Sequence, residues 1–120
     1  MHRPDRIRLQ HMLDAAREAV ASVQGRARAD LDHDRIWALG LVKCIEIIGE
    51  AAARVTPEAR SQFSQIPWPQ IVGMRNRLVH VYFDLDLDQV WNAVAQDLPP
   101  LIATLETLLQ QEPPTRTGTK

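Results

Sequence analysis

Apolar residues recur three and four positions apart along most of the chain, which is the spacing of an amphipathic helix. From Asp5 to Gln24 they fall on one helical face, and Gly25 supplies a stop signal. A second helix is predicted to start within residues 32–34 and to end near Val55. No segment alternates apolar and polar residues with a period of two, so the pattern predicts an all-α fold.

The second helix is predicted to present distinct faces. Residues 36–42 are apolar almost all round, which predicts burial on more than one side. Polar residues beyond them form one stripe, which we expect to be a solvated or interface face: Lys43, Glu46, Glu50 and Arg54. Gly49 is small enough to let another helix approach closely.

Prolines divide the second half of the chain into further helices. Thr56 and Pro57 have the pattern of the N-cap and first residue of a short helix that reaches residue 62 or 63. Residues 66–69 begin a third main helix, because proline is tolerated in a first turn. This helix is expected to give way around residues 81–83.

The last helix is predicted from a long apolar stripe. Asp86 or Asp88 can cap its start, and residues 99–100, both proline, should kink it because each removes a backbone donor. The expected architecture is an antiparallel bundle of four main helices plus one or two short ones over residues 1–111. Residues 112–120 have no apolar periodicity and are expected to form a disordered tail.

The composition fits one globular domain with an aliphatic core. Hydrophobic residues make up 45% and charged residues 24%, which excludes a wholly disordered chain, and aromatic residues make up only 5%. The net charge of −1 excludes a globally basic surface for nucleic acid, but it does not exclude a local basic patch. All but two of the 14 basic residues are arginine, whose planar fork suits phosphate recognition.

A single cysteine, Cys44, excludes an intrachain disulfide framework and a Cys-rich zinc site. It lies in an apolar run, which favours a buried, reduced thiol. Residues 1–5 lack the apolar core of a signal peptide, and no stretch is apolar for long enough to span a membrane. We therefore expect a cytoplasmic protein without membrane contact.

One segment at the end of the third helix gathers several reactive side chains: Arg75, Asn76, Arg77, His80 and Tyr82. They offer permanent cations, an amide, an imidazole that titrates near neutral pH and a phenol. Cleavage of RNA by its own 2′-hydroxyl needs such groups, because a base, an acid and a cation for the phosphorane oxygens all take part. The reaction requires no metal ion and no other cofactor.

Spacing alone leaves two interpretations of this segment open. Asn76 and His80 are four residues apart and share a helical face, so the amide can orient the imidazole. One helix supplies a single imidazole, so a site that needs both an acid and a base would be completed by a second copy of the chain. An arginine and a histidine near a helix C-terminus, however, more often only bind its free carbonyl groups.

Two other motifs indicate helix starts rather than catalysis. His33-Asp34 is the dipeptide of metal-dependent phosphohydrolases, but partner residues at useful spacings are missing. Residues 84–88 have aspartate at every second position, like the opening of a calcium-binding loop, yet Gln89 stands where that loop has glycine. Negative charge at a helix N-terminus is the simpler explanation.

The order Arg75-x-x-x-x-His80-x-Tyr82 resembles the motif of HepT-like toxins, which belong to the HEPN superfamily of small helical ribonucleases. The likeness extends to residues 46–52 and to the segments on both sides of the histidine, and together it covers most of residues 5–110. The bare spacing of arginine and histidine is a weak signal, whereas the joint pattern is specific.

The resemblance implies a HEPN-like helical bundle that forms a homodimer, with the arginine and histidine of both subunits lining one cleft. It also implies a metal-independent endoribonuclease that cleaves tRNA or mRNA. By this resemblance His80 is the acid or base, Arg75 binds the phosphate and Asn76 orients the imidazole. Further RNA contacts are expected from three residues: Arg77, Arg54 and Lys43.

The resemblance also implies a partner. HepT-like toxins are usually encoded beside a minimal nucleotidyltransferase antitoxin of the MntA kind, which transfers AMP to the tyrosine of the motif, here Tyr82. AMP at this position would compete with RNA for Arg75 and Arg77, provided that the helix unwinds near Val81 as we expect. The alternative function is a non-catalytic helical adaptor that binds and regulates such a nucleotidyltransferase.

Overall fold

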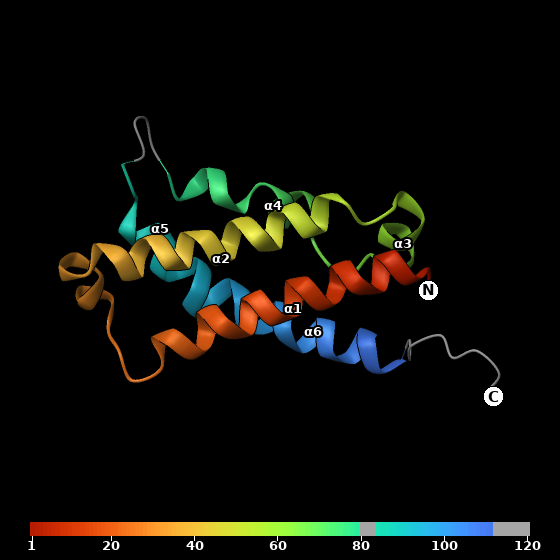
Figure 1. Ribbon diagram of the computed structural model, residues 1–120, viewed down its shortest axis with the longest axis horizontal. Coiled ribbons are helices and arrows are strands. Elements are labelled where there is room, and N and C mark those ends of the chain that lie inside the picture. The colour runs from red at the N-terminus through yellow and green to blue at the C-terminus, as the bar shows by residue number, and fades with distance from the viewer. Residues whose placement is uncertain (80–83, 112–120) are drawn as a thin grey trace.

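The computed structural model describes residues 1–79 and 84–111, and this part of the chain is helical, without a strand (Figure 1). In chain order its elements are α1 (Arg3–Val23), the 3-10 helix η1 (Arg28–His33), α2 (Arg35–Ala53), α3 (Pro57–Gln62), α4 (Trp68–Val72), the 3-10 helix η2 (Met74–Arg77), α5 (Leu87–Asn92), the π-helical segment η4 (Ala93–Asp97) and α6 (Leu98–Gln111). The all-α prediction is confirmed. Within the described residues, no helix combines the length and the apolar character needed to cross a lipid bilayer.

The long helices enclose an aliphatic core. Figure 1 shows α1 and α2 side by side and antiparallel, with α6 along another side of α1. The side chains that meet between them are completely buried, among them Leu9, Met12, Ile45, Ile48 and Leu105. This confirms the apolar face predicted for the first helix and the aliphatic core expected from the low aromatic content.

The predicted helix caps are present. The hydroxyl of Thr56 accepts a hydrogen bond from the backbone N–H of Ala59 at 3.3 Å, and the carboxylate of Asp86 accepts one from Gln89 at 3.2 Å. Asp5, only 2% exposed, accepts hydrogen bonds from the backbone N–H and the hydroxyl of Thr56 at 2.9 and 2.7 Å. This buried carboxylate therefore ties the start of α3 to α1.

The prediction of one continuous third main helix from residues 66–69 onward is wrong. α4 ends at Val72, and after Gly73 the chain continues as the 3-10 helix η2. The tighter turn is closed by backbone hydrogen bonds from Asn76 to Gly73 at 3.1 Å and from Leu78 to Arg75 at 3.0 Å. Glycine has a low helix propensity, so the chain can leave the α-helix here when packing requires it. Short helical pieces therefore replace one of the four expected long helices.

The last helix is interrupted where its prolines predict a disruption. Between α5 and α6, the segment η4 has the wider π-helical hydrogen bonding. Pro99 and Pro100 have no N–H to offer to the carbonyl groups four residues earlier, which lie in η4. The wider turn accommodates these carbonyl groups, so the disruption takes the form of a π-helical segment.

The expected burial of residues 36–42 on several sides is wrong. Ile36 is 79% exposed and Leu39 is 39% exposed, whereas Ala38 and Leu41 are buried. The described elements cover only one side of this part of α2, so its other side faces solvent in a single chain. An apolar sequence pattern cannot show this, because it does not say how many neighbours a helix has.

The sequence predicted that Cys44 is buried, but its side chain is only half-buried. Burial raises the pKa of its thiol, and the nearby carboxylate of Glu18 raises it further. The thiol is therefore protonated at neutral pH and is not an activated nucleophile.

Candidate active site

Arg75 extends from η2 to the polar stripe of α2. Its Nε donates a hydrogen bond to Oε2 of Glu46 at 3.1 Å, and Nζ of Lys43 lies 3.8 Å from Oε1 of the same carboxylate. The side chain of Arg75 is 38% exposed, so the pair lies at the surface. Among the described residues, Glu46 is the only group that bonds this guanidinium, which leaves the terminal nitrogens available for a phosphate.

Gly49 explains how Arg75 reaches this position. A Cβ atom on Gly49 would lie 3.2 Å from the carbonyl oxygen of Val72 and 3.4 Å from that of Ile71, so the end of α4 rests almost directly on α2. Gly49 follows Glu46 by one helical turn, and η2 therefore begins beside Glu46. The close approach that the sequence predicts at Gly49 is confirmed.

An open groove of about 430 Å³ lies beside the Arg75–Glu46 pair. One wall is formed by α2, including Glu50, and the other by the segment from Val72 to Asn76. Asn76 is exposed, so its amide is accessible in this groove. The structure therefore brings together Arg75 and Asn76, two of the residues that the sequence assigns to one site.

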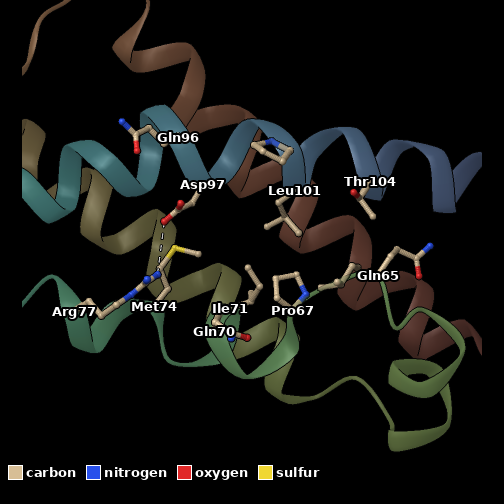
Figure 2. A pocket seen from close by; sticks show the side chains of 12 residues that line it. Gln65, Pro67, Gln70, Ile71, Met74, Arg77, Gln96, Asp97, Leu101 and Thr104 are labelled. Atoms are coloured by element: carbon tan, nitrogen blue, oxygen red, sulfur yellow. Dashed lines mark ion pairs between the residues drawn. The ribbon is translucent and has the colours of Figure 1, made fainter.

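Arg77 points to a different part of the molecule. Figure 2 shows its guanidinium directed at Asp97, whose carboxylate is 3.7 Å away on the π-helical segment η4. The two residues line a separate hollow of about 340 Å³, whose floor includes Met74 and Leu101. Arg75 and Arg77 are close in sequence, but they do not share one binding surface on this chain.

Lys43 and Arg54 lie on the predicted polar stripe of α2. Lys43 is 66% exposed and pairs with Glu46 at one end of the Arg75 groove. Arg54 follows the last residue of α2 and lines a smaller adjoining hollow of about 150 Å³. Glu50 lines both hollows, which makes them neighbours on one face of the helix.

His80 and Tyr82 lie outside the described residues. The contact between Asn76 and His80, the role of Tyr82 and the unwinding near Val81 therefore stay predictions. The described chain on both sides is fixed by a backbone bridge between Val79 and Leu85.

The comparison with protein families identifies the fold. Residues 12–108 match the model of the family described as ribonuclease HepT-like. The chain belongs to the HepT-like ribonuclease family. Its enzyme class is that of an endoribonuclease, as the resemblance implied.

Relatives of similar length support this assignment. A protein of Caldanaerobacter subterraneus subsp. tengcongensis, provisionally named an RNase, is 32% identical over 87% of this chain and 93% of its own length. One from Methanocaldococcus jannaschii, also provisionally named an RNase, is 28% identical over 82% of this chain and 90% of its own length. A Thermococcus cleftensis protein, provisionally named ribonuclease HepT, is 32% identical over 62% of this chain and 68% of its own length. No solved structure matches the chain significantly.

The two motifs that we interpreted as helix starts have that role. The carboxylate of Asp34 accepts a hydrogen bond from the backbone of Trp37 at 3.0 Å and caps α2. Asp88 lies in the first turn of α5 and pairs with Arg28 at 2.7 Å. The hydrogen bonds that Arg28 donates to the carboxylates of Asp32 and Asp88 raise its pKa. Within the described residues, no three His, Cys, Asp or Glu side chains are grouped as a metal site requires.

Sequence reasoning understated one residue of the site and missed two others. Glu46 was predicted only as part of a solvated or interface stripe, yet it is the partner of Arg75. Arg8 and His11 had no assigned role, although they line the hollow that contains Arg54. Their spacing of three along α1 places them on one face, but only the packing of α1 against α2 brings them near Arg54.

Proposed function

We propose that this HepT-like ribonuclease cleaves RNA without a metal ion, with Arg75 as the phosphate ligand and His80 as the acid or base. The observation that carries the proposal is the position of Arg75. Its Nε is held by Glu46 at the edge of an open groove, and its terminal nitrogens are directed to no other described group. A guanidinium fixed in this way is suited to binding two oxygens of one phosphate.

The reaction follows from these groups. A base removes the proton of the 2′-hydroxyl, whose oxygen attacks the adjacent phosphorus, and an acid protonates the 5′-oxygen as its bond to phosphorus breaks. The products are a 2′,3′-cyclic phosphate and a free 5′-hydroxyl. Arg75 stabilises the negative charge of the phosphorane oxygens, while Asn76 keeps the imidazole of His80 oriented.

A homodimer would complete the site, because one chain contributes one imidazole for two proton transfers. The surface of α2 supports this part of the proposal. Ile36 and Leu39 are exposed on this helix, and Val72, which lines the Arg75 groove, is 38% exposed. A second copy that covers this face would remove these apolar side chains from water and would bring two Arg75 grooves together.

The RNase would act as the toxin of a pair with an MntA-like nucleotidyltransferase. In the silencing step, the Tyr82 oxygen attacks the α-phosphorus of ATP, the phenolic proton passes to a base, and pyrophosphate leaves. The added AMP would bring a negative phosphate near Arg75, where RNA must bind. Arg77 would contribute less to this competition than the sequence suggests, because it pairs with Asp97 in another hollow.

Cleavage in the absence of metal tests the catalytic part of the proposal. Protein produced without the nucleotidyltransferase should cut single-stranded RNA in EDTA and should arrest growth when expressed. Arg75→Ala and His80→Ala should each lower the cleavage rate by about 10²- to 10³-fold, and Arg35→Ala, on an exposed residue of α2, should not. Wild-type protein that is inactive and harmless would instead support the adaptor function.

Intact mass tests the regulatory part. Co-expression with the nucleotidyltransferase should add one or more AMP groups to the wild type and none to Tyr82→Phe. The modified wild type should lose RNA cleavage, whereas Tyr82→Phe should stay active beside the nucleotidyltransferase. An unchanged mass, or AMP on another residue, would contradict the assignment of Tyr82.

A further inference from the structure

A second basic hollow adjoins the Arg75 groove along α2. Arg8 and His11 reach it from α1, and Arg54 reaches it from the C-terminal end of α2. Glu50 is on the wall that separates this hollow from the Arg75 groove, since it lines both. The hollow is small, about 150 Å³, against about 430 Å³ for the Arg75 groove.

Within the described residues, the basic side chains of this hollow form no ion pair, whereas six other basic residues do. The basic residues that pair with carboxylates are Arg17, Arg26, Arg28, Lys43, Arg75 and Arg77. Across residues 1–79 and 84–111, the side chains of Arg8, His11 and Arg54 form no ion pair. Two guanidinium groups face one carboxylate, so the hollow carries a net positive charge.

The spacing along α2 connects this hollow with the candidate active site. Arg54 follows Glu46, the partner of Arg75, by eight residues, which corresponds to a rise of about 12 Å. A single strand of RNA with one phosphate at Arg75 can therefore place a nearby phosphate in the second hollow. Glu50, between the two cationic groups, is placed where a ribose hydroxyl can donate a hydrogen bond to a carboxylate.

We propose that Arg8, His11 and Arg54 form a second phosphate-binding subsite, which holds the RNA backbone a short distance from the scissile phosphate. The proposal rests on the proposed RNase function and adds the path of the substrate. The groups recognise phosphate and read no base, so the subsite increases affinity for any single strand that is long enough to span both hollows. It does not take part in bond cleavage.

A double substitution with a matched control tests the subsite. Arg8→Gln with Arg54→Gln removes one guanidinium from α1 and one from α2, and Arg3→Gln with Arg35→Gln does the same at exposed arginines elsewhere on these helices. For a long oligoribonucleotide, the first pair should raise KM about tenfold and leave kcat unchanged, whereas the control pair should match the wild type. For a dinucleotide, which cannot reach the second hollow, neither pair should change kcat/KM.

Binding measured without cleavage separates this inference from the proposed function. Fluorescence anisotropy with a single-stranded RNA that carries a 2′-deoxy group at the scissile position gives the salt dependence of Kd. Loss of one phosphate contact should reduce the slope of log Kd against log salt by about 0.7 in the Arg8/Arg54 variant only. This result would support the subsite even if the wild type cleaved no RNA.

Two outcomes would overturn the subsite. One is that both double variants have the same KM and the same salt slope. The other is that the Arg8/Arg54 variant loses as much activity on the dinucleotide as on the long oligoribonucleotide. Thermal unfolding monitors folding, and the single change Arg54→Gln, at the exposed end of α2, serves if the double variant does not fold. Arg54→Lys retains the charge and should recover most of the affinity.

Discussion

The hydrogen bond from Arg75 to Glu46 orients a side chain rather than stabilising the fold. Both partners are partly exposed, and surface ion pairs of this kind contribute at most about 1 kcal/mol to the free energy of unfolding. The bond uses Nε, so it leaves the two terminal nitrogens of Arg75, which lines the groove, without a partner among the described residues. Glu46 is therefore a positioning residue for the proposed phosphate ligand.

Removal of Glu46 should affect cleavage more than folding. We expect Glu46→Ala to lower kcat/KM for RNA about tenfold, because the Arg75 side chain loses its fixed orientation. Glu46→Gln keeps an oxygen that can accept the hydrogen bond and should recover most of the activity, and neither change should shift the unfolding midpoint by more than a few degrees. Equal activity of the alanine and glutamine variants would contradict the positioning role, and Glu58→Ala, on exposed α3, is the control.

At the scale of the elements, the contact between α2 and α4 decides where the site is. α4 is short and stops at Val72, next to Gly49, and the turn that carries Arg75 follows at once. The position of Arg75 thus depends on how closely two backbones approach. A glycine on α2 sets this distance.

Two glycines of α2 allow a matched test of this contact. Gly40 has no atom within 4 Å of its ideal Cβ position, so Gly40→Ala should stabilise the fold of the single chain by up to about 1 kcal/mol. Gly49→Ala has the same gain in helix propensity but must displace the carbonyl of Val72 by a few tenths of an ångström. We expect this displacement to cancel the gain in stability, measured by thermal unfolding. We also expect Gly49→Ala to reduce the rate of RNA cleavage at least severalfold. Equal behaviour of the two variants would show that the contact is irrelevant to the site.

At the scale of the whole molecule, one side of α2 is left uncovered. Ile36 is 79% exposed, an unusual value for an isoleucine at the start of an apolar run. We expect this side to be covered in the proposed homodimer, which would explain why the sequence predicts a buried stretch where the single chain shows a surface.

Sedimentation velocity tests this expectation. The wild type should sediment as a dimer, and Ile36→Glu should weaken dimerisation at least about tenfold, because a charge would be buried at the contact. Cleavage should fall in parallel as the dimer dissociates. Ile7→Glu, at a residue of α1 that is 42% exposed, is the control and should stay dimeric. A monomeric wild type that cleaves RNA fully would contradict the dimer.

Some of the site could be predicted and some could not. The family motif indicated Arg75, and the small size of Gly49 predicted a close approach; the structure places both residues at one groove. The helical break at Gly73 was missed, because the apolar residues around it keep a helical period on both sides. Arg8 was missed because nothing in a sequence shows which helix will pack beside α2.

The sequence by itself determined the features that depend on neighbours three or four residues away. These are the helical faces, the caps at Thr56 and Asp86, and the family motif. Only the tertiary structure decided what each cation faces. Arg75 and Arg77 are two residues apart, but successive residues of a 3-10 turn diverge by about 120°, so each meets the carboxylate of a different helix. Ion pairs between helices depend on how the helices pack, and no local pattern encodes that.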